Sequence, residues 1–348
     1  MNDSILYSAI RSLFTAFCAV IGIGLGIVFF TILIGALSSG STESKLKTVN
    51  THEIMPNAKG EREALSKTTP VILQINVDGV IGTEGLSMQT VRQQLIESRE
   101  GDFKDDRVKA LLVYINSPGG TVVDSDGIYR ALKEYKEKYK VPVYAFVDGL
   151  CASGGMYVAS AADKIYATDA SLIGSVGVIA PTFMNVVKLM DKIGVDTLTL
   201  TAGTDKDAMN PFRVWKPGEE KNYQDIIDYY YKQFVNIVST GRKDLSKEKL
   251  VKDYGAKIFN AEAAKENGYV DQSNATIAEA LTDLKKAAGI EDDKYQVVKL
   301  ENKSWWNSLF SEDSALFTGK VKYQLQILPE MDPALQNKYL YLYCPAMQ

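Results

Sequence analysis

Two short segments carry the residue types that could do chemistry, and each contains a pair of glycines. Residues 116–120 read Asn-Ser-Pro-Gly-Gly and residues 151–155 read Cys-Ala-Ser-Gly-Gly, and each lies between an apolar stretch and a helical pattern. Glycine lets the backbone approach a ligand closely, so its N–H groups can point at a carbonyl oxygen that is becoming an anion. Ser153 precedes a helix, and the field of a helix N-terminus lowers the cost of forming an alkoxide. The two segments therefore indicate a nucleophilic serine beside an oxyanion hole.

Both segments also fit interpretations that involve no catalysis. Serine is a preferred N-cap residue and Gly-Gly is common in turns, so either segment could be a simple strand-to-helix connection. A phosphate-binding loop is a further alternative, although neither segment has the GxxxxGKS or GxxxxGKT spacing.

A serine nucleophile needs a general base, and the sequence restricts the choice. The single histidine, His52, lies in the polar stretch 38–68, which has the composition of a flexible tether. A catalytic histidine must be held within hydrogen-bond reach of its nucleophile, so we expect no catalytic role for His52. A carboxylate or a lysine whose pKa is lowered by burial remains. The sequence thus favours a Ser/Lys dyad, but spacing does not identify the lysine.

The elements that must position these segments are those of a buried, mainly parallel sheet. Apolar, β-branched stretches alternate with amphipathic helical ones, which is typical of parallel strands covered by helices. Tyr229, Tyr230 and Tyr231 lie together in the longest helix, so at least one of them must face a groove or a partner. We expect strands at 71–77, 110–116, 141–147, 164–167, 173–179 and 197–201, and helices at 88–100, 121–140, 153–162, 217–241, 261–267 and 276–288.

Composition limits the class of protein. The chain has 348 residues, of which 46% are hydrophobic and 24% charged, as in a globular protein with a sizeable core. The formal net charge is -4, and a chain without a surplus of Lys and Arg is poorly suited to non-specific nucleic-acid binding. Cys18, Cys151 and Cys344 show no CxxC spacing, so we expect no metal site, no disulfide framework and no cofactor.

The N-terminal region has the length and composition of a membrane anchor. No residue from Ser12 to Thr42 is charged, and the apolar part exceeds the roughly 20 residues that span a bilayer. A cleaved signal peptide and a buried soluble helix are the alternatives. The length favours an anchor over a signal peptide, because a signal peptide has a shorter apolar core. Arg11 precedes the span while Lys45 and Lys47 follow it, so charge does not decide the orientation.

Four motifs occur in a fixed order: INSPGG (115–120), CASGGMYVASAADKIYA (151–167), GSVGVI (174–179) and TAGTDKDAMNPF (201–212). This order resembles the signal peptide peptidase A family of membrane-anchored serine proteases, over roughly residues 70–289. The resemblance implies an α/β, crotonase/Clp-protease-like fold with repeated ββα units and one N-terminal transmembrane helix. The sequence departs from the family at Met156, where tyrosine is frequent, and at Cys151, where small residues are usual.

The resemblance also assigns residues. It implies Ser153 as the nucleophile, Lys206 as the base, and Ser175 as a residue that supports the lysine. The oxyanion hole is expected from the N–H groups of Gly119, Gly120 and Gly154.

We expect five segments: a short tail (1–11), a transmembrane anchor (12–37), a polar tether (38–68), a protease domain (69–290) and a C-terminal extension without an assigned role (291–348). The expected protein is a membrane-tethered serine endopeptidase that acts on signal-peptide remnants or membrane-protein fragments. The resemblance further implies a homo-oligomer, lipid contact through the anchor and a catalytic domain outside the cytoplasm. A catalytically dead membrane scaffold and a crotonase-like thioester enzyme are the alternatives.

Overall fold

The computed structural model describes residues 51–301 and 340–342, together with 13–15, 17, 21, 22 and 26. Contacts divide the chain into two units, Met1–Val49 and Asn50–Gln348, and the second carries the fold given below. None of the helices that the described residues form is both long and apolar enough to cross a membrane. The predicted anchor at 12–37 lies almost wholly outside the described residues, and it stays a prediction.

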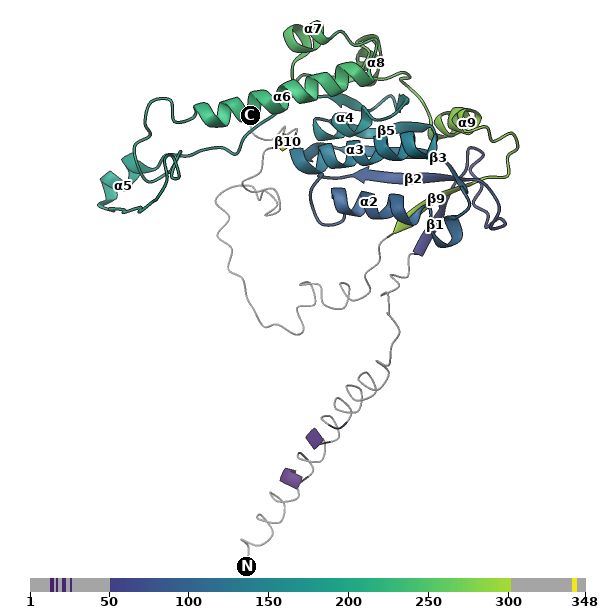
Figure 1. The fold of residues 1–348 in the computed structure, drawn as a ribbon, viewed down its shortest axis with the longest axis horizontal. Coiled ribbons are helices and arrows are strands. Elements are labelled where there is room, and N and C mark those ends of the chain that lie inside the picture. Colours follow the sequence, from purple (N-terminus) through teal and green to yellow (C-terminus); the bar gives the residue numbers. More distant parts are fainter. Residues whose placement is uncertain are drawn as a thin grey trace, which may run out of the picture. The chain divides into compact units, whose positions relative to one another are not determined.

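A mixed eight-stranded sheet forms the centre of the second unit (Figure 1). The strand order is β1-β9-β2-β3-β5-β7-β8, and β6 also pairs with β5. The inner strands are parallel, whereas β1 pairs antiparallel with β9 and β7 pairs antiparallel with β8. The strands of this sheet are β1 (Thr51–Met55), β2 (Val71–Asp78), β3 (Val108–Ser117), β5 (Val143–Ala152), β6 (Lys164–Ala167), β7 (Leu172–Gly174), β8 (Ile258–Asn260) and β9 (Gln296–Glu301).

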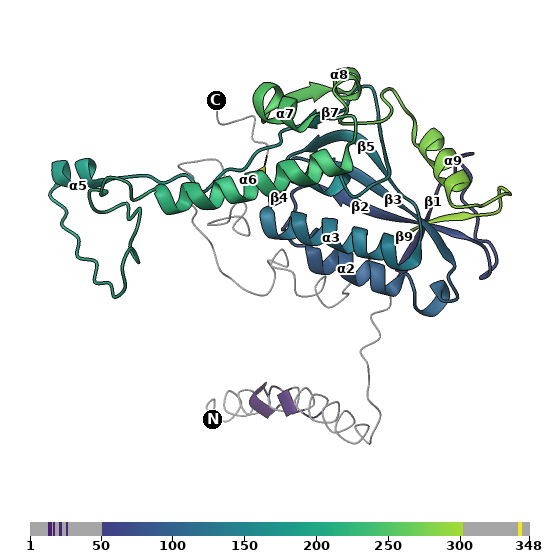
Figure 2. The ribbon, with the colours of Figure 1, turned by 45° about the horizontal axis from the view of Figure 1, so that its top comes forward.

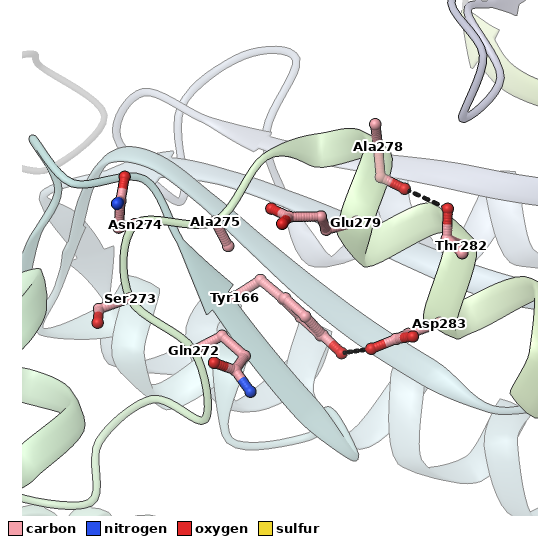
Figure 3. A pocket seen from close by; sticks show the side chains of 9 residues that line it. All are labelled: Tyr166, Gln272, Ser273, Asn274, Ala275, Ala278, Glu279, Thr282 and Asp283. Carbon is pink, nitrogen blue, oxygen red and sulfur yellow. Dashed lines mark hydrogen bonds between the residues drawn. The ribbon is translucent and has the colours of Figure 1, made fainter.

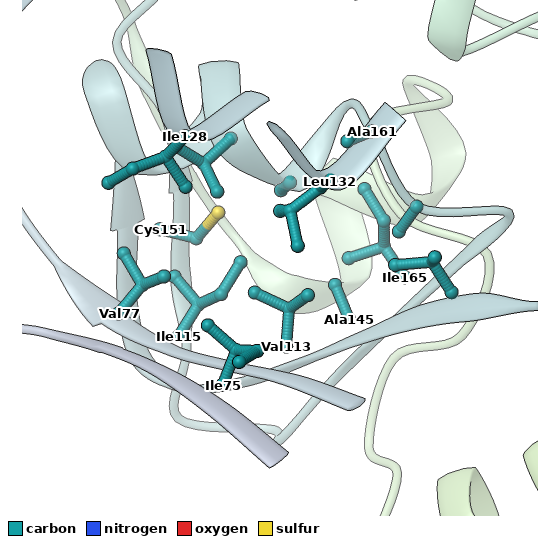
Figure 4. Packing of buried hydrophobic residues seen from close by; sticks show 14 of the residues in the cluster. Ile75, Val77, Val113, Ile115, Ile128, Leu132, Ala145, Cys151, Ala161 and Ile165 are labelled. Carbon is teal, nitrogen blue, oxygen red and sulfur yellow. The ribbon is translucent and has the colours of Figure 1, made fainter. Parts of the chain in front are cut away.

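Helices cover both faces of this sheet, because alternate residues of the inner strands point to opposite sides. Ile75 and Val113 pack against Ile128 of α3 on one face (Figure 4), while Ile72 packs with Leu281 of α9 on the other. Figure 2 shows α2 and α3 side by side on their face and α9 apart from them. The helical elements are α2 (Met88–Glu97), η1 (Gly101–Phe103), α3 (Val122–Tyr139), α4 (Gly154–Ala159), α5 (Val187–Ile193), α6 (Lys221–Gly241), α7 (Lys247–Lys249), η2 (Leu250–Tyr254), α8 (Ala261–Glu266) and α9 (Ile277–Ala287).

A second, two-stranded sheet lies beside the nucleophile segment. It pairs β4 (Gly119–Thr121) with β10 (Leu340–Leu342) in antiparallel register. The order β3, β4, α3 gives one ββα unit of the expected kind.

Several elements differ from the sequence-based expectations. β5 continues through Asp148 and Gly149 to Ala152, because its last residues pair with β7 rather than turning. β7 ends at Gly174, where a φ of 130° bends the chain away from the sheet. The expected strand at 197–201 is wrong, since these residues are exposed and pair with no strand in the described structure.

Two strands lie where no regular structure was expected. β1, in the expected tether, and β9, in the expected C-terminal extension, pair with each other, and β9 also pairs with β2. β9 is short, but Val297, Val298 and Leu300 are all buried, which makes it part of the core. The sheet therefore extends beyond both expected boundaries of the protease domain.

Residues 179–219, which we call the arm, connect β7 to α6 and extend away from the sheet in both views (Figures 1 and 2). The arm contains α5, which buries none of its residues. Its exposed large apolar residues are Ile179, Met184, Leu189, Ile193, Val195, Leu198, Leu200, Phe212 and Val214. On the adjoining α6, Tyr229 is exposed while Tyr230 and Tyr231 pack against the core, as three consecutive tyrosines on one helix require.

Candidate active site

Ser153 lies at the junction between β5 and α4, in a backbone conformation that L-residues seldom adopt. Its φ is 54° and its ψ is -116°. The Ser153 N–H donates to the Gly174 carbonyl at 2.9 Å, and its carbonyl accepts from the Tyr157 N–H at 3.0 Å. Strained residues of this kind persist only where neighbouring structure holds them, and they cluster at functional sites. The geometry is thus that of a serine presented on a fixed turn.

The two glycine segments meet at this turn. A Cβ added to Gly154 would lie 2.5 Å from the Ser125 hydroxyl oxygen and 3.1 Å from both the Gly119 Cα and the Gly120 nitrogen. No larger residue fits there without a shift, so the backbone after Ser153 lies directly against the Gly119-Gly120 turn. The structure therefore brings together four of the six predicted site residues: Ser153, Gly154, Gly119 and Gly120.

Ser117 organises the first glycine segment, and sequence reasoning missed it. Its hydroxyl donates to the Gly79 carbonyl at 2.6 Å and accepts from the Gly119 N–H at 3.1 Å. The Gly119 N–H is therefore engaged within the turn, and Gly120 and Gly154 are the better candidates for oxyanion donors. The signal was present in the sequence as the serine before Pro-Gly-Gly.

Ser175 lies one residue after the carbonyl that holds Ser153. It is buried, has a φ of 55°, and its N–H donates to the Lys257 carbonyl at 2.8 Å. A Cβ on Gly174 would lie 2.4 Å from that same carbonyl oxygen, so only glycine fits there. Ser175 is thus fixed next to the residue that accepts the Ser153 N–H, and its expected role in supporting Lys206 stays a prediction.

Lys206 is not brought to Ser153 within one chain. It lies in the arm after α5, its side chain is exposed, and its N–H makes a long 3.4 Å contact with the Gly203 carbonyl. No hydrogen bond or ion pair between described residues joins Lys206 to Ser153. The part of the arm between α5 and α6 lies away from α4 in both views (Figures 1 and 2). The pairing of Ser153 with Lys206 stays a prediction.

Two other residues that could compete for the chemistry are placed unfavourably. His52 lies in β1 and contacts Phe103, with ring centroids 5.7 Å apart. Four strand spacings separate β1 from β5, which is about 19 Å across the sheet. Burial raises the pKa of the Cys151 thiol to about 12, so the thiolate is absent near neutral pH. Ser153 is the nucleophile candidate that remains at this junction.

The edge of β4 is occupied by the chain's own β10. The register pairs Tyr341 with Gly120 and Leu342 with Gly119, so the strand runs alongside the Gly119-Gly120 turn. β10 also contacts α3 and α4, and Ser153 is only 1% exposed. The site can therefore hold an extended peptide in antiparallel register next to Ser153.

One cavity between described residues lies away from this junction. It has a volume of about 430 Å³ and lies between β6 and α9 (Figure 3). Two of its polar groups have partners within the protein: the Tyr166 hydroxyl donates to Asp283 at 2.7 Å, and Glu279 completes the N-terminal capping box of α9. It contains none of the predicted site residues, and nothing in its chemistry points to catalysis.

A strained serine after a buried parallel strand, on a turn packed against a Gly-Gly turn, is an arrangement suited to a hydrolase on an α/β fold. The chain matches the model of Peptidase family S49 over residues 134–291 and that of Clp protease over residues 83–173. The fold is therefore Clp-protease-like, with the mixed sheet described above.

Relatives agree with these matches. The chain is 32% identical over 286 residues to an Enterococcus faecium protein named as a signal peptide peptidase SppA, covering 78% of this chain and 81% of that protein. It is 37% identical over 239 residues to a Synechocystis protein named as a protease, covering 68% and 81%. It is 31% identical over 245 residues to protease 4 of Haemophilus influenzae, covering 68% of this chain and 38% of the longer relative.

The chain belongs to peptidase family S49, and it is a protease of the SppA type. This confirms the resemblance read from the four motifs.

Proposed function

We propose that the protein is a membrane-tethered serine endopeptidase with Ser153 as nucleophile and Lys206 as base. The observation that carries this proposal is the contact between the Ser153 turn and the Gly119-Gly120 turn, which leaves no room for a Cβ at Gly154. Family membership makes peptide bonds the substrate.

The mechanism follows from the groups around Ser153. Lys206, in its neutral form, accepts the hydroxyl proton as the Ser153 oxygen attacks the peptide carbonyl. The N–H groups of Gly120 and Gly154 stabilise the oxyanion, and such donors are worth roughly 3–4 kcal/mol each in related sites. The protonated lysine then gives its proton to the leaving amine, so an acyl-enzyme and a free amine form. Lys206 then takes a proton from water as that water attacks the ester, and the protonated lysine gives the proton to the Ser153 oxygen as it leaves.

A second copy of the chain supplies the base in this proposal. Lys206 lies in the arm with its side chain exposed and has no hydrogen bond to Ser153 of its own chain, and the arm exposes several large apolar side chains. Exposed apolar patches of this kind mark interfaces in soluble domains. We therefore propose a homo-oligomer in which the arm of one copy brings Lys206 to Ser153 of its neighbour. Sedimentation of residues 50–348 should give an oligomer, whereas monomer alone at micromolar concentration contradicts this.

Substrates are proposed to bind as extended strands on β4, in the way that β10 does. Main-chain hydrogen bonds to a strand edge give affinity without demanding one sequence. One relative is named as a signal peptide peptidase, so signal-peptide remnants and other membrane-derived peptides are the proposed substrates. With the N-terminal anchor, the domain is proposed to lie outside the cytoplasm.

Labelling with a serine-reactive fluorophosphonate tests the proposed nucleophile. The protein should be labelled at Ser153, and Ser153→Ala should abolish the label, while Ser160→Ala in the next turn should keep it. A protein labelled on no serine fits a catalytically dead scaffold or a thioester enzyme, and contradicts the proposal.

A further inference from the structure

The arm is folded around an ion cluster rather than an apolar core. Met209 is the only buried residue among 179–219. The segment nevertheless holds two tight backbone positions, Asp205 at a φ of 57° and Met209 at a φ of 58°. Something other than hydrophobic burial must fix these turns.

Arg213 provides that fixed point. Its guanidinium donates to the Asp207 carboxylate at 2.7 Å and 3.2 Å, and to the Asp207 carbonyl at 2.8 Å. It also donates to both carboxylate oxygens of Glu219, one of them at 2.9 Å. Glu219 accepts further bonds from the N–H groups of Met209 at 3.1 Å and Lys216 at 2.8 Å.

This cluster differs from an ordinary surface ion pair. Exposed ion pairs contribute about 0–1 kcal/mol to stability. Here the Glu219 side chain is only 4% exposed, and the planar fork of the Arg213 guanidinium binds both oxygens of each of the two carboxylates. Lysine cannot reproduce such a fork, because its ammonium is a single point of charge. The contacts with Arg213 lower the pKa of Asp207, and they lower that of Glu219 to about 2.

Lys206 is the residue immediately before Asp207. Arg213 holds Asp207 at both its carbonyl and its carboxylate, and Asp205, which precedes Lys206, lies in a tight turn. Arg213 also occupies the carboxylate of Asp207, one of the two aspartates that adjoin Lys206 in the sequence. Without Arg213, the Asp207 carboxylate could pair with the Lys206 amine and favour the charged, inactive form of the lysine.

We infer that Arg213 is a positioning residue for catalysis: through Asp207 it aims Lys206, and it keeps the Asp207 carboxylate from pairing with that lysine. Besides Lys206, the charged residues of the segment 205–219 are Asp205, Asp207, Arg213, Lys216 and Glu219. This inference rests on the proposed role of Lys206 as base.

The test uses the assembled full-length protein and a peptide substrate. Arg213→Met should lower kcat by roughly tenfold to a hundredfold with little change in KM, since a misplaced base affects the chemical step. The acid limb of kcat/KM should move to higher pH by about one unit. Adding Asp207→Asn to Arg213→Met should move the limb back, because the competing charge is gone. Arg62→Met, which removes an exposed arginine paired with Glu53, is the matched control and should change nothing.

An unmoved acid limb in Arg213→Met, or no return with Asp207→Asn, overturns the inference and leaves the cluster a folding role only. Should Arg213→Met fail to assemble, Arg213→Lys decides. It keeps the charge but not the fork, so a lowered kcat with an unmoved limb is expected, and an unchanged kcat overturns the inference. Lys206→Ala distinguishes failure of the proposed base from failure of the inference on Arg213. Full activity of Lys206→Ala contradicts the proposed base, whatever the Arg213 variants do.

Discussion

At the scale of single residues, the site depends on backbone conformation more than on side-chain contacts. Ser153 is placed by one hydrogen bond from its own N–H to Gly174 and by its positive φ. No side chain among the described residues bonds the Ser153 hydroxyl. This agrees with the proposal that the base is a lysine carried on the arm of another copy.

The acid side of the pH profile tests the base. The base works only when neutral, so kcat/KM should fall with a single ionisation as pH falls. Lys206→Ala and Lys206→Arg should both lose most turnover, since a guanidinium does not deprotonate in proteins. His52→Ala is the control and should keep wild-type kcat/KM. Near-full activity of Lys206→Arg combined with loss in His52→Ala would show that the dyad is wrong.

The space at Gly154 gives a second prediction at this scale. Gly154→Ala places a Cβ 2.5 Å from the Ser125 hydroxyl oxygen and 3.1 Å from the Gly120 nitrogen, so the backbone that carries the two proposed oxyanion donors must shift. We expect kcat to fall by about a hundredfold or more, as when an oxyanion donor is removed. Steady-state assays with a peptide ester measure this fall in kcat. Unchanged kcat with an intact melting temperature argues against an oxyanion role for this turn.

Cys151 should be inert to thiol reagents in the folded protein. Burial raises its pKa to about 12, so the reactive thiolate forms only as pH approaches that value. Iodoacetamide at pH 8 should leave the Cys151 peptide unmodified, and the same reagent in guanidinium should modify it. Rapid labelling of the native protein would mean that the β5 end opens readily.

At the scale of elements, Tyr157 joins α4 to two other helices. Its hydroxyl donates to Asp126 of α3 at 2.7 Å, and Gln233 of α6 donates to the same carboxylate oxygen at 3.2 Å. The Tyr157 ring packs on Phe234 of α6, with centroids 5.1 Å apart. The helix that follows the nucleophile is thereby tied to the helix that follows the arm.

Tyr157→Phe should destabilise the fold by about 2 kcal/mol, because a hydrogen bond to a carboxylate is lost in the interior. Thermal or urea unfolding measures the change. Tyr229→Phe, on the exposed face of α6, is the matched control and should leave stability unchanged. Equal stability of the two variants contradicts the role of this hydrogen bond.

Long, strongly patterned elements were predictable from sequence, whereas short ones were not. α3 and α6 were expected close to their observed bounds, since their apolar spacing repeats over several turns. β1 and β9 were missed, because a short strand shows no period until its partner is known. The glycine turns and Ser153 were predictable because their residue types are rare in combination. The ion cluster of the arm was not predictable from the sequence, because nothing in the sequence distinguishes Arg213 and Glu219 from ordinary surface charges.

At the scale of the whole molecule, the C-terminal strand competes with substrate. β10 occupies the β4 edge on which an extended peptide is proposed to bind. A stop codon in place of Leu340 should therefore raise kcat/KM for short peptides, chiefly through a lower KM. A free peptide of the sequence of residues 338–348 should inhibit the truncated protein competitively. No change in KM on truncation shows that β10 does not hold the edge in solution.

The central claim is that Ser153 of one copy works with Lys206 of another, and co-expression of two inactive variants tests it most directly. Ser153→Ala lacks the nucleophile and Lys206→Ala lacks the base, so each alone should be inactive. In a mixed oligomer, a site with an intact serine and a neighbour's intact lysine is restored. Random pairing of equal amounts predicts about one quarter of wild-type activity. Mixed oligomers that form but show no more activity than either variant alone would contradict the account.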